Sequence, residues 1–156
     1  GARGESPVRY WIHGNMLTVN GRKMAKSEGN GFTPEELISG NHKLLEQGYS
    51  AMTVRFFMLQ CHYGSTLDFS NEALQAAEKG FKKLMTALST MQSLSTSDSG
   101  DCDGQDLNDR CVHAMNDDFN TPIMISVLFD GVKMINSIND GSRSIDTQNH
   151  ACHRLF

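Results

Sequence analysis

The chain has 156 residues, 38% of them hydrophobic and 21% charged, a composition typical of globular rather than disordered proteins. Its net charge of −4 excludes a strongly basic nucleic-acid binder, and its four cysteines are too few for a disulfide scaffold. The charge is uneven, because residues 1–60 hold seven Lys and Arg against five Asp and Glu, whereas residues 61–156 hold seven against thirteen. We therefore expect an anionic partner to meet the first segment.

Two short apolar runs, residues 10–12 and 16–19, predict strands near the start of the chain. Asn20-Gly21 directly after the second run predicts a tight hairpin turn. Residues 22–31 lack periodicity and contain two glycines and three cations. This composition predicts an exposed loop after the hairpin turn.

Helical signals begin at Thr33-Pro34-Glu35-Glu36, a capping box with proline in the first turn, and Gly40 ends this short helix. A second helix is predicted from Ser50 to about Cys61, followed by a loop over residues 64–68. Its predicted apolar face consists of Val54, Phe57, Met58 and Cys61.

Ser70 is a suitable cap for a third helix of about 24 residues, the strongest amphipathic pattern in the chain. Residues 95–106 are rich in Ser, Asp and Gly and predict a flexible loop. A helix is expected from Leu107, another from Asn120-Thr121-Pro122 to Asn139, and the start of one more over residues 145–156. The predicted fold is mainly α, with a helical bundle after a short β remnant.

The segment Lys23-Met24-Ala25-Lys26-Ser27 places two ammonium groups three residues apart in a loop that follows a strand. Two lysines on a mobile loop can converge on one phosphate chain and stabilise the charge that develops during its transfer. The alternative for any such pair is a solvated basic loop.

This segment resembles the Lys-Met-Ser-Lys-Ser loop of class I aminoacyl-tRNA synthetases, with Ala25 in place of the middle serine. The resemblance implies a loop that closes on ATP while an amino-acid carboxylate attacks the α-phosphate. Lys26 would be the principal phosphate contact and Lys23 would support it, while Ser27 and Gly29 would shape the loop. The Ala25 departure removes a hydroxyl group and no charge.

Surrounding motifs resemble one member family, cysteinyl-tRNA synthetase, in the same order along the chain. They are Tyr10-Trp11-Ile12-His13, Ser27-Glu28-Gly29-Asn30, Val54-Arg55-Phe56-Phe57, His62-Tyr63-Gly64-Ser65, Leu67-Asp68-Phe69-Ser70 and Asp117-Asp118-Phe119-Asn120-Thr121-Pro122. Two departures stand out. Glu28 replaces the usual Leu and adds a carboxylate beside the phosphate loop, and Gly64 replaces a frequent Arg that could contact a tRNA backbone.

The resemblance implies an internal piece of a longer enzyme that converts ATP and cysteine to cysteinyl-adenylate and transfers the cysteine to tRNA(Cys). Residues 1–32 would end its nucleotide-binding catalytic domain, and residues 33–94 would form the helical stem-contact region with the long helix. Residues 95–106 would be a flexible loop and residues 107–156 the truncated start of a helical tRNA-binding bundle. Both ends of the chain would then be cuts, and the fragment alone would be inactive.

The implied cofactors are ATP with Mg²⁺, and Zn²⁺ in the parent enzyme. Neither the family's His-x-Gly-His motif nor its zinc ligands occur in the sequence, so the zinc site is expected upstream of this chain. Cys61-His62 and Cys152-His153 are adjacent pairs without zinc-ligand spacing. We interpret Cys61 and Cys111 as core thiols, and His62 and His113 as structural or surface residues.

Other patterns keep simpler interpretations. Asp117-Asp118 before a helix start favours capping over acid–base chemistry, and the Asp98–Asp106 stretch lacks the spacing of a calcium loop. The cations Lys79, Lys82 and Lys83 could follow a tRNA backbone or form a solvated face.

The expected parent is a cytoplasmic monomer with reduced thiols. No membrane segment is expected in this sequence, because its longest apolar run is far shorter than about 18 residues. Two other functions remain open. One is the related cysteine ligase of mycothiol synthesis, which acylates an amino sugar, and the other is a non-catalytic RNA-binding module.

Overall fold

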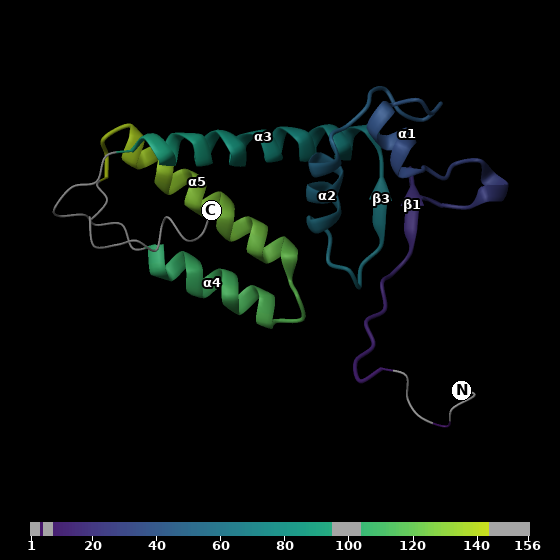
Figure 1. The fold of residues 1–156 in the computed structure, drawn as a ribbon, viewed down its shortest axis with the longest axis horizontal. Helices are drawn as coiled ribbons and strands as arrows, with labels where there is room; N and C mark the ends of the chain where they lie inside the picture. Colours follow the sequence, from purple (N-terminus) through teal and green to yellow (C-terminus); the bar gives the residue numbers. More distant parts are fainter. Residues whose placement is uncertain (1–3, 5–7, 95–103, 144–156) are drawn as a thin grey trace.

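The computed structural model describes residue 4, residues 8–94 and residues 104–143. A small sheet and two short helices lie at one end, and three long helices make up the rest (Figure 1). The longest helix, α3 (Asn71–Ser93), runs from the sheet to the far end and joins the two parts. The chain is thus mainly helical with a small β portion, as the sequence predicts.

The sheet has three short strands in the order β2-β1-β3: β1 (Leu17–Val19), β2 (Arg22–Lys23) and β3 (Leu67–Phe69). β1 and β2 form the predicted hairpin, in which Asn20 and Gly21 have φ values of 50° and 73°. Positive φ at both central residues is the requirement of a type I′ turn. β3 pairs with β1 in parallel, with Val19 opposite Phe69.

Three predictions about the β portion are wrong. Residues 10–12 form no strand, and Tyr10 is 87% exposed, because no strand in the described part of the chain lies alongside this run. β3 extends into the predicted loop over residues 64–68, because β1 supplies a partner some 50 residues away. The predicted loop over residues 22–31 contains β2 and a short 3₁₀ helix, η1 (Lys26–Glu28).

The short helix α1 (Pro34–Ser39) starts and ends at the predicted residues. Thr33 and Glu36 form both halves of the capping box, and Gly40 ends the helix with φ 73°. The positive φ at this position favours glycine, and so does the space around it. A Cβ on Gly40 would lie 2.4 Å from the backbone nitrogen of Gly48.

Helix α2 (Ala51–Leu59) is capped by Ser50, as predicted, but its buried face differs from the prediction. Thr53, Phe56 and Phe57 are buried, whereas Met58 is 43% exposed. The helix packs against α3, and its Phe57 contacts Phe69 of β3, with ring centroids 4.9 Å apart. The buried face of α2 is therefore wider than the predicted apolar face.

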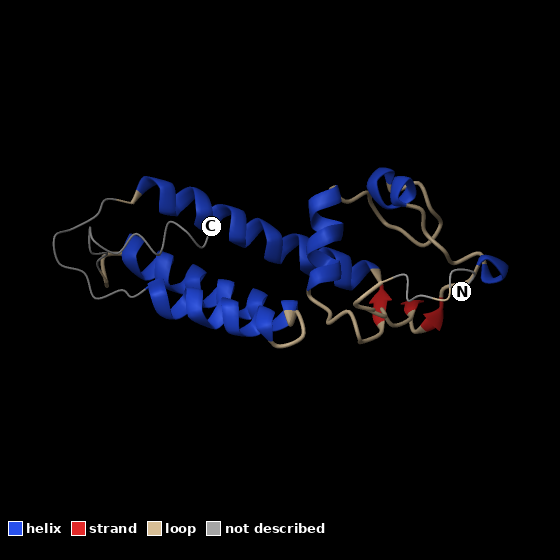
Figure 2. Cartoon of the chain, turned by 60° about the horizontal axis from the view of Figure 1, so that its bottom comes forward, coloured by secondary structure: helices blue, strands red, loops and turns tan. Residues whose placement is uncertain are grey.

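Helices α4 (Gly104–Asn116) and α5 (Thr121–Asn139) form an antiparallel hairpin against α3 (Figure 2). Asn120 caps α5 at the predicted position. Residues 104–106 belong to α4 and not to the predicted loop. The rest of that loop, residues 95–103, and the helix expected over 145–156 lie outside the described residues.

A single core cluster runs through the sheet, α1, α2, α3 and α5. Gly80 lets α3 approach its neighbours closely, because a Cβ there would lie 3.3 Å from Phe56 of α2 and 3.5 Å from Phe129 of α5. The two ends of the molecule therefore share one packed interior at the middle of α3.

By length and composition, α5 could cross a membrane, with 19 residues and a mean hydropathy of 1.2. This indication is weak, because core helices of soluble proteins meet the same test. In the structure α5 packs on α3 and α4, and its Asp130 accepts hydrogen bonds from Arg110 of α4 (2.7 Å) and from Lys133 (2.9 Å).

Candidate functional site

The base of the Lys23–Ser27 loop is fixed by the sheet. Asp68 of β3 accepts hydrogen bonds from the Gly21 backbone N–H (2.8 Å) and from the Thr18 hydroxyl (2.6 Å). The carboxylate thereby ties the β1–β2 turn to the neighbouring strand. Asp68, more than 40 positions later in the sequence, therefore helps to set the direction in which the loop leaves β2.

Lys23 ends β2 and is exposed, while Met24 turns inward and packs against the core cluster. The Met24 N–H donates to the Leu17 carbonyl (3.1 Å), and Ala25 is half-buried. Lys26 begins η1, but the structure does not describe its side chain, and Ser27 is exposed. The apolar residue in the middle of the motif thus anchors the loop and leaves Lys23 on the surface.

Asn30 is the residue that closes this loop, a role that its sequence pattern does not reveal. Its side chain accepts the Ala25 N–H (2.9 Å) and donates to the Lys23 carbonyl (3.1 Å). It is a rare buried polar side chain, 8% exposed. Both contacts are to the backbone of the motif, so Asn30 holds the loop's shape and leaves its side chains free.

Beside the loop is a depression of about 380 Å³, whose walls carry Arg22, Glu28, Gly29 and Lys43. The Lys43 ammonium lies 3.6 Å from the position that a Cβ on Gly29 would occupy. Arg22, Lys23 and Lys43 make the surroundings of the loop cationic, with Glu28 as the opposing charge. This cluster can attract a polyanion such as a phosphate chain.

The remaining predicted cations lie apart from the loop. Lys79, Lys82 and Lys83 are exposed on α3, and Lys82 pairs with Glu78 (3.3 Å). Whether this surface contacts RNA stays a prediction.

The described residues do not fit a metal site, since they contain no group of three or more His, Cys, Asp or Glu able to hold an ion. Cys61 and Cys111 are half-buried free thiols, and burial raises the pKa of Cys111. A raised thiol pKa opposes formation of the thiolate that metals and electrophiles require.

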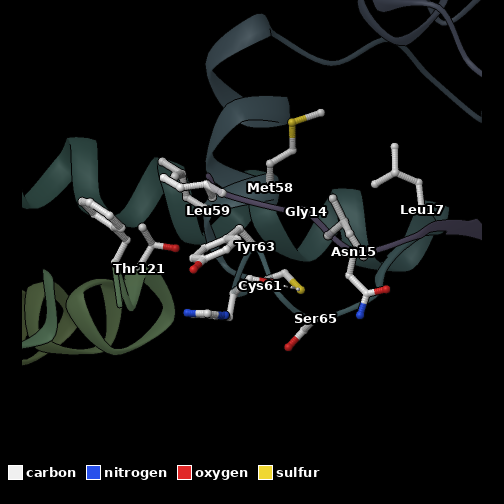
Figure 3. A pocket seen from close by; sticks show the side chains of 13 residues that line it. Gly14, Asn15, Leu17, Met58, Leu59, Cys61, Tyr63, Ser65 and Thr121 are labelled. Atoms are coloured by element: carbon white, nitrogen blue, oxygen red, sulfur yellow. Dashed lines mark hydrogen bonds between the residues drawn. The ribbon is translucent and has the colours of Figure 1, made fainter. Parts of the chain in front are cut away.

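A second, larger cavity of about 560 Å³ lies between α2, β3 and the start of α5 (Figure 3). Its lining is mostly apolar and includes Leu17, Met58, Leu59 and Phe119. Tyr63 extends across it with the hydroxyl group toward Thr121 (Figure 3). This cavity lacks the cations of the loop, so the two hollows differ in chemistry.

Comparisons with known proteins match the two ends of the chain to two family models. Residues 1–79 match the model of the tRNA synthetases class I (C) catalytic domain, and residues 110–155 match the DALR domain. The first match contains the whole Lys23–Ser27 loop with Asp68 and Asn30, and the second begins within α4.

Similar curated proteins are named cysteine–tRNA ligases. The chain is 54% identical to that of Bacteroides fragilis over 144 residues, which are 92% of the chain and 29% of the relative. It is 51% identical to that of Parabacteroides distasonis over 147 residues (94% and 30%) and 43% identical to that of Chlorobium chlorochromatii over 150 residues (96% and 29%). The chain thus spans about 30% of the length of these relatives.

These matches agree with the resemblance drawn from the loop and its flanking motifs. The catalytic-domain model covers half of the chain, and high identity extends over most of the rest. The chain belongs to the cysteinyl-tRNA synthetase family of class I synthetases.

Proposed function

We propose that the protein containing this chain is an ATP-dependent cysteine–tRNA ligase. It forms cysteinyl-adenylate from cysteine and ATP and then transfers cysteine to tRNA(Cys). The observation that carries the proposal is the Lys23–Ser27 loop, held on a hairpin by Asp68 and Asn30 within the segment that matches the catalytic domain.

In this proposal the loop acts on the phosphates of ATP. A cysteine carboxylate oxygen attacks the α-phosphorus, and the bond to the leaving pyrophosphate breaks. Charge grows on the leaving group, and Lys26, supported by Lys23, stabilises it by a preorganised electrostatic interaction. Met24, Ala25 and Ser27 carry the backbone that holds these two lysines at the phosphates.

ATP would bind with Mg²⁺, which neutralises part of the phosphate charge. The zinc of the family belongs, in our proposal, to ligands upstream of this chain, as the family resemblance implies. We also propose a cytoplasmic, monomeric parent, and a division of the chain into the end of a catalytic domain (1–32), a stem-contact region (33–94), a connecting loop and a tRNA-binding bundle.

The match of residues 110–155 to the DALR domain supports a tRNA acceptor over an amino-sugar acceptor. The same match also supports a contact between the α4–α5 hairpin and RNA. A purely RNA-binding module could use the cation cluster for an RNA backbone, but it would leave the catalytic-domain match of residues 1–79 without a role.

Assays of the full-length protein test this function. We expect cysteine-dependent exchange of pyrophosphate into ATP, and cysteinylation of tRNA(Cys) in preference to an amino-sugar acceptor. Absence of exchange would favour the binding module, and exchange with acylation of the sugar alone would favour the mycothiol-type ligase. Residues 1–156 by themselves should catalyse neither step.

A further inference from the structure

The turn between α4 and α5 has an unusual backbone. Asp118 and Phe119 both have φ values of 53°, in the left-handed region that favours glycine. Asp tolerates this conformation better than most residues, but a bulky side chain such as Phe rarely adopts it. Two successive residues in this region persist only where surrounding contacts hold them.

Part of this support is local to the two helices. The Phe119 N–H donates to the Met115 carbonyl (3.2 Å), and the Asn120 N–H donates to the Ala114 carbonyl (3.0 Å), which closes the end of α4. The Asn120 side chain accepts the Ile123 N–H (3.3 Å) and starts α5. These bonds fix the turn relative to its own helices, and they do not fix the hairpin relative to the sheet.

The contacts that reach the sheet come from His62 and Tyr63, between α2 and β3. The Tyr63 hydroxyl donates to a carboxylate oxygen of Asp118 (2.6 Å), and His62 Nε2 lies 2.9 Å from the Asp118 carbonyl oxygen. His62 Nδ1 accepts the Gly64 N–H (3.2 Å), so Nε2 is the nitrogen that donates to Asp118. The two rings are in contact, with centroids 4.6 Å apart and their planes tilted by 32°.

These two hydrogen bonds connect the segments that match the two family models. His62 and Tyr63 lie in the catalytic-domain match, and Asp118 lies in the DALR match. Apolar contacts of α5 with α3 also join the segments, but such contacts are non-directional and define the relative orientation less sharply than hydrogen bonds do. Hydrogen bonds to a fixed carboxylate and carbonyl are directional and define one orientation.

We propose that His62, Tyr63 and Asp118 form a latch that sets the orientation of the α4–α5 hairpin relative to the phosphate loop. The inference rests on the proposed function: RNA held by the hairpin must present its terminal hydroxyl at the adenylate. The latch then acts in the transfer step, in which that hydroxyl oxygen attacks the cysteinyl carbonyl and AMP leaves. It has no role in adenylate formation, because neither ATP nor cysteine requires the hairpin.

Tyr63→Phe in the full-length protein tests the latch, because it removes one hydroxyl group and keeps the ring. We expect pyrophosphate exchange within twofold of wild type, and kcat/KM for tRNA cysteinylation reduced about tenfold, the value of one hydrogen bond to a charged group. Asp118→Ala should likewise reduce tRNA cysteinylation and leave pyrophosphate exchange nearly unchanged. The kcat/KM for cysteinylation should fall no further in the double variant than in the more impaired single variant, because both substitutions remove the same contact. Tyr10→Phe, at an exposed tyrosine, is the matched control.

Equal losses in exchange and cysteinylation, or no loss in either, would overturn the latch. Wild-type protein without exchange would instead contradict the proposed function. In that case hydrogen–deuterium exchange decides the latch on its own: Tyr63→Phe should increase deuterium uptake of the turn over residues 117–120 at least threefold. Unchanged uptake there would overturn the latch whatever the enzyme's activity.

Discussion

The segments that match the two family models are held together by different forces. In the catalytic segment, residues 8–79, polar side chains bind the backbone of irregular loops. Asp68 and Asn30 do so at and beside the Lys23–Ser27 loop, and Asn71 binds the Leu44 carbonyl (2.9 Å) and the Glu46 N–H (3.0 Å). In the helical segment, residues 104–139, buried apolar faces of α4 and α5 supply most of the contact.

The difference has a functional consequence. Irregular loops need directional hydrogen bonds, because each unpaired backbone group inside a fold costs free energy. Long helices pair their own backbone and need only an apolar face. Single polar substitutions in the catalytic segment should therefore disturb chemistry or local structure strongly. The surface of the helical segment should tolerate similar changes, except at Asp118, which contacts the catalytic segment.

The largest effect is expected for Lys26→Ala in the full-length protein. Cysteine-dependent pyrophosphate exchange should fall roughly 10²–10³-fold, the usual loss for one transition-state donor. Lys133→Ala is the matched control in the helical segment, where the exposed ammonium pairs with Asp130 of the same helix. Exchange that survives Lys26→Ala unchanged would remove Lys26 from the proposed mechanism.

Gly40→Ala should cause the largest loss of stability. Both Gly40 and Gly141 have left-handed backbones, so Ala at either site costs about 1–2 kcal/mol. At Gly40 the new Cβ would also meet Gly48 at 2.4 Å, whereas at Gly141 it would meet no described atom within 4 Å. Overpacking should add about 1–3 kcal/mol to the free energy lost at Gly40 alone.

Denaturant unfolding of the full-length protein measures both glycine variants. Equal losses at Gly40 and Gly141 would mean that the loop between Gly40 and Gly48 moves aside without cost. The close backbone approach would then not be a constraint on the catalytic segment.

Asn30→Ala should reduce pyrophosphate exchange about tenfold while the protein stays folded. The substitution removes two hydrogen bonds to the loop backbone, each contributing about 0.5–1.5 kcal/mol. Lys23 and Lys26 remain but lose their fixed spacing. Asn41→Ala, an exposed residue of the next loop, controls for a general effect of asparagine loss. Wild-type rates in Asn30→Ala would show that ATP alone shapes the loop.

The smallest effect is expected for the pH dependence of the stability of α1. Hydrogen bonds from the Thr33 N–H (2.8 Å) and the Thr33 hydroxyl (2.9 Å) lower the pKa of Glu36 below 4.5. A lowered pKa in the folded state adds stability that is present above pH 4.5 and is lost as the pH falls through the folded-state pKa. The protection factors of the Leu37 and Gly40 amides in hydrogen exchange should therefore fall on acidification more in wild type than in Glu36→Gln.

Glu35→Gln is the control for this measurement. It removes the charge of an exposed neighbour and leaves the bonds between Thr33 and the Glu36 carboxylate in place. Identical acid sensitivity in wild type and Glu36→Gln would contradict the assigned role of the capping box.

Local signals in the sequence determined much of the helical structure. Thr33 and Gly40 bound α1, Ser70 starts α3, and Asn120 with Pro122 starts α5, all as predicted. Capping is accurate at this level because the partner groups lie within three or four residues along the chain. The Lys23–Ser27 motif is likewise a local signal, because its two lysines lie three residues apart in the sequence, and the phosphate contact that it predicts remains a proposal.

Only the tertiary structure decided how the loop is held and how the two segments meet. β3 forms because β1 lies beside it, Asp68 binds a turn 47 residues away, and Asp118 binds Tyr63 rather than capping α5. Each of these contacts joins residues whose separation leaves no periodic or capping signal. The sequence by itself therefore determined most helix boundaries and the paired lysines of the Lys23–Ser27 motif. Long-range hydrogen bonds decided the geometry in which that motif is held, because a directional contact exists only once the fold brings both partners together.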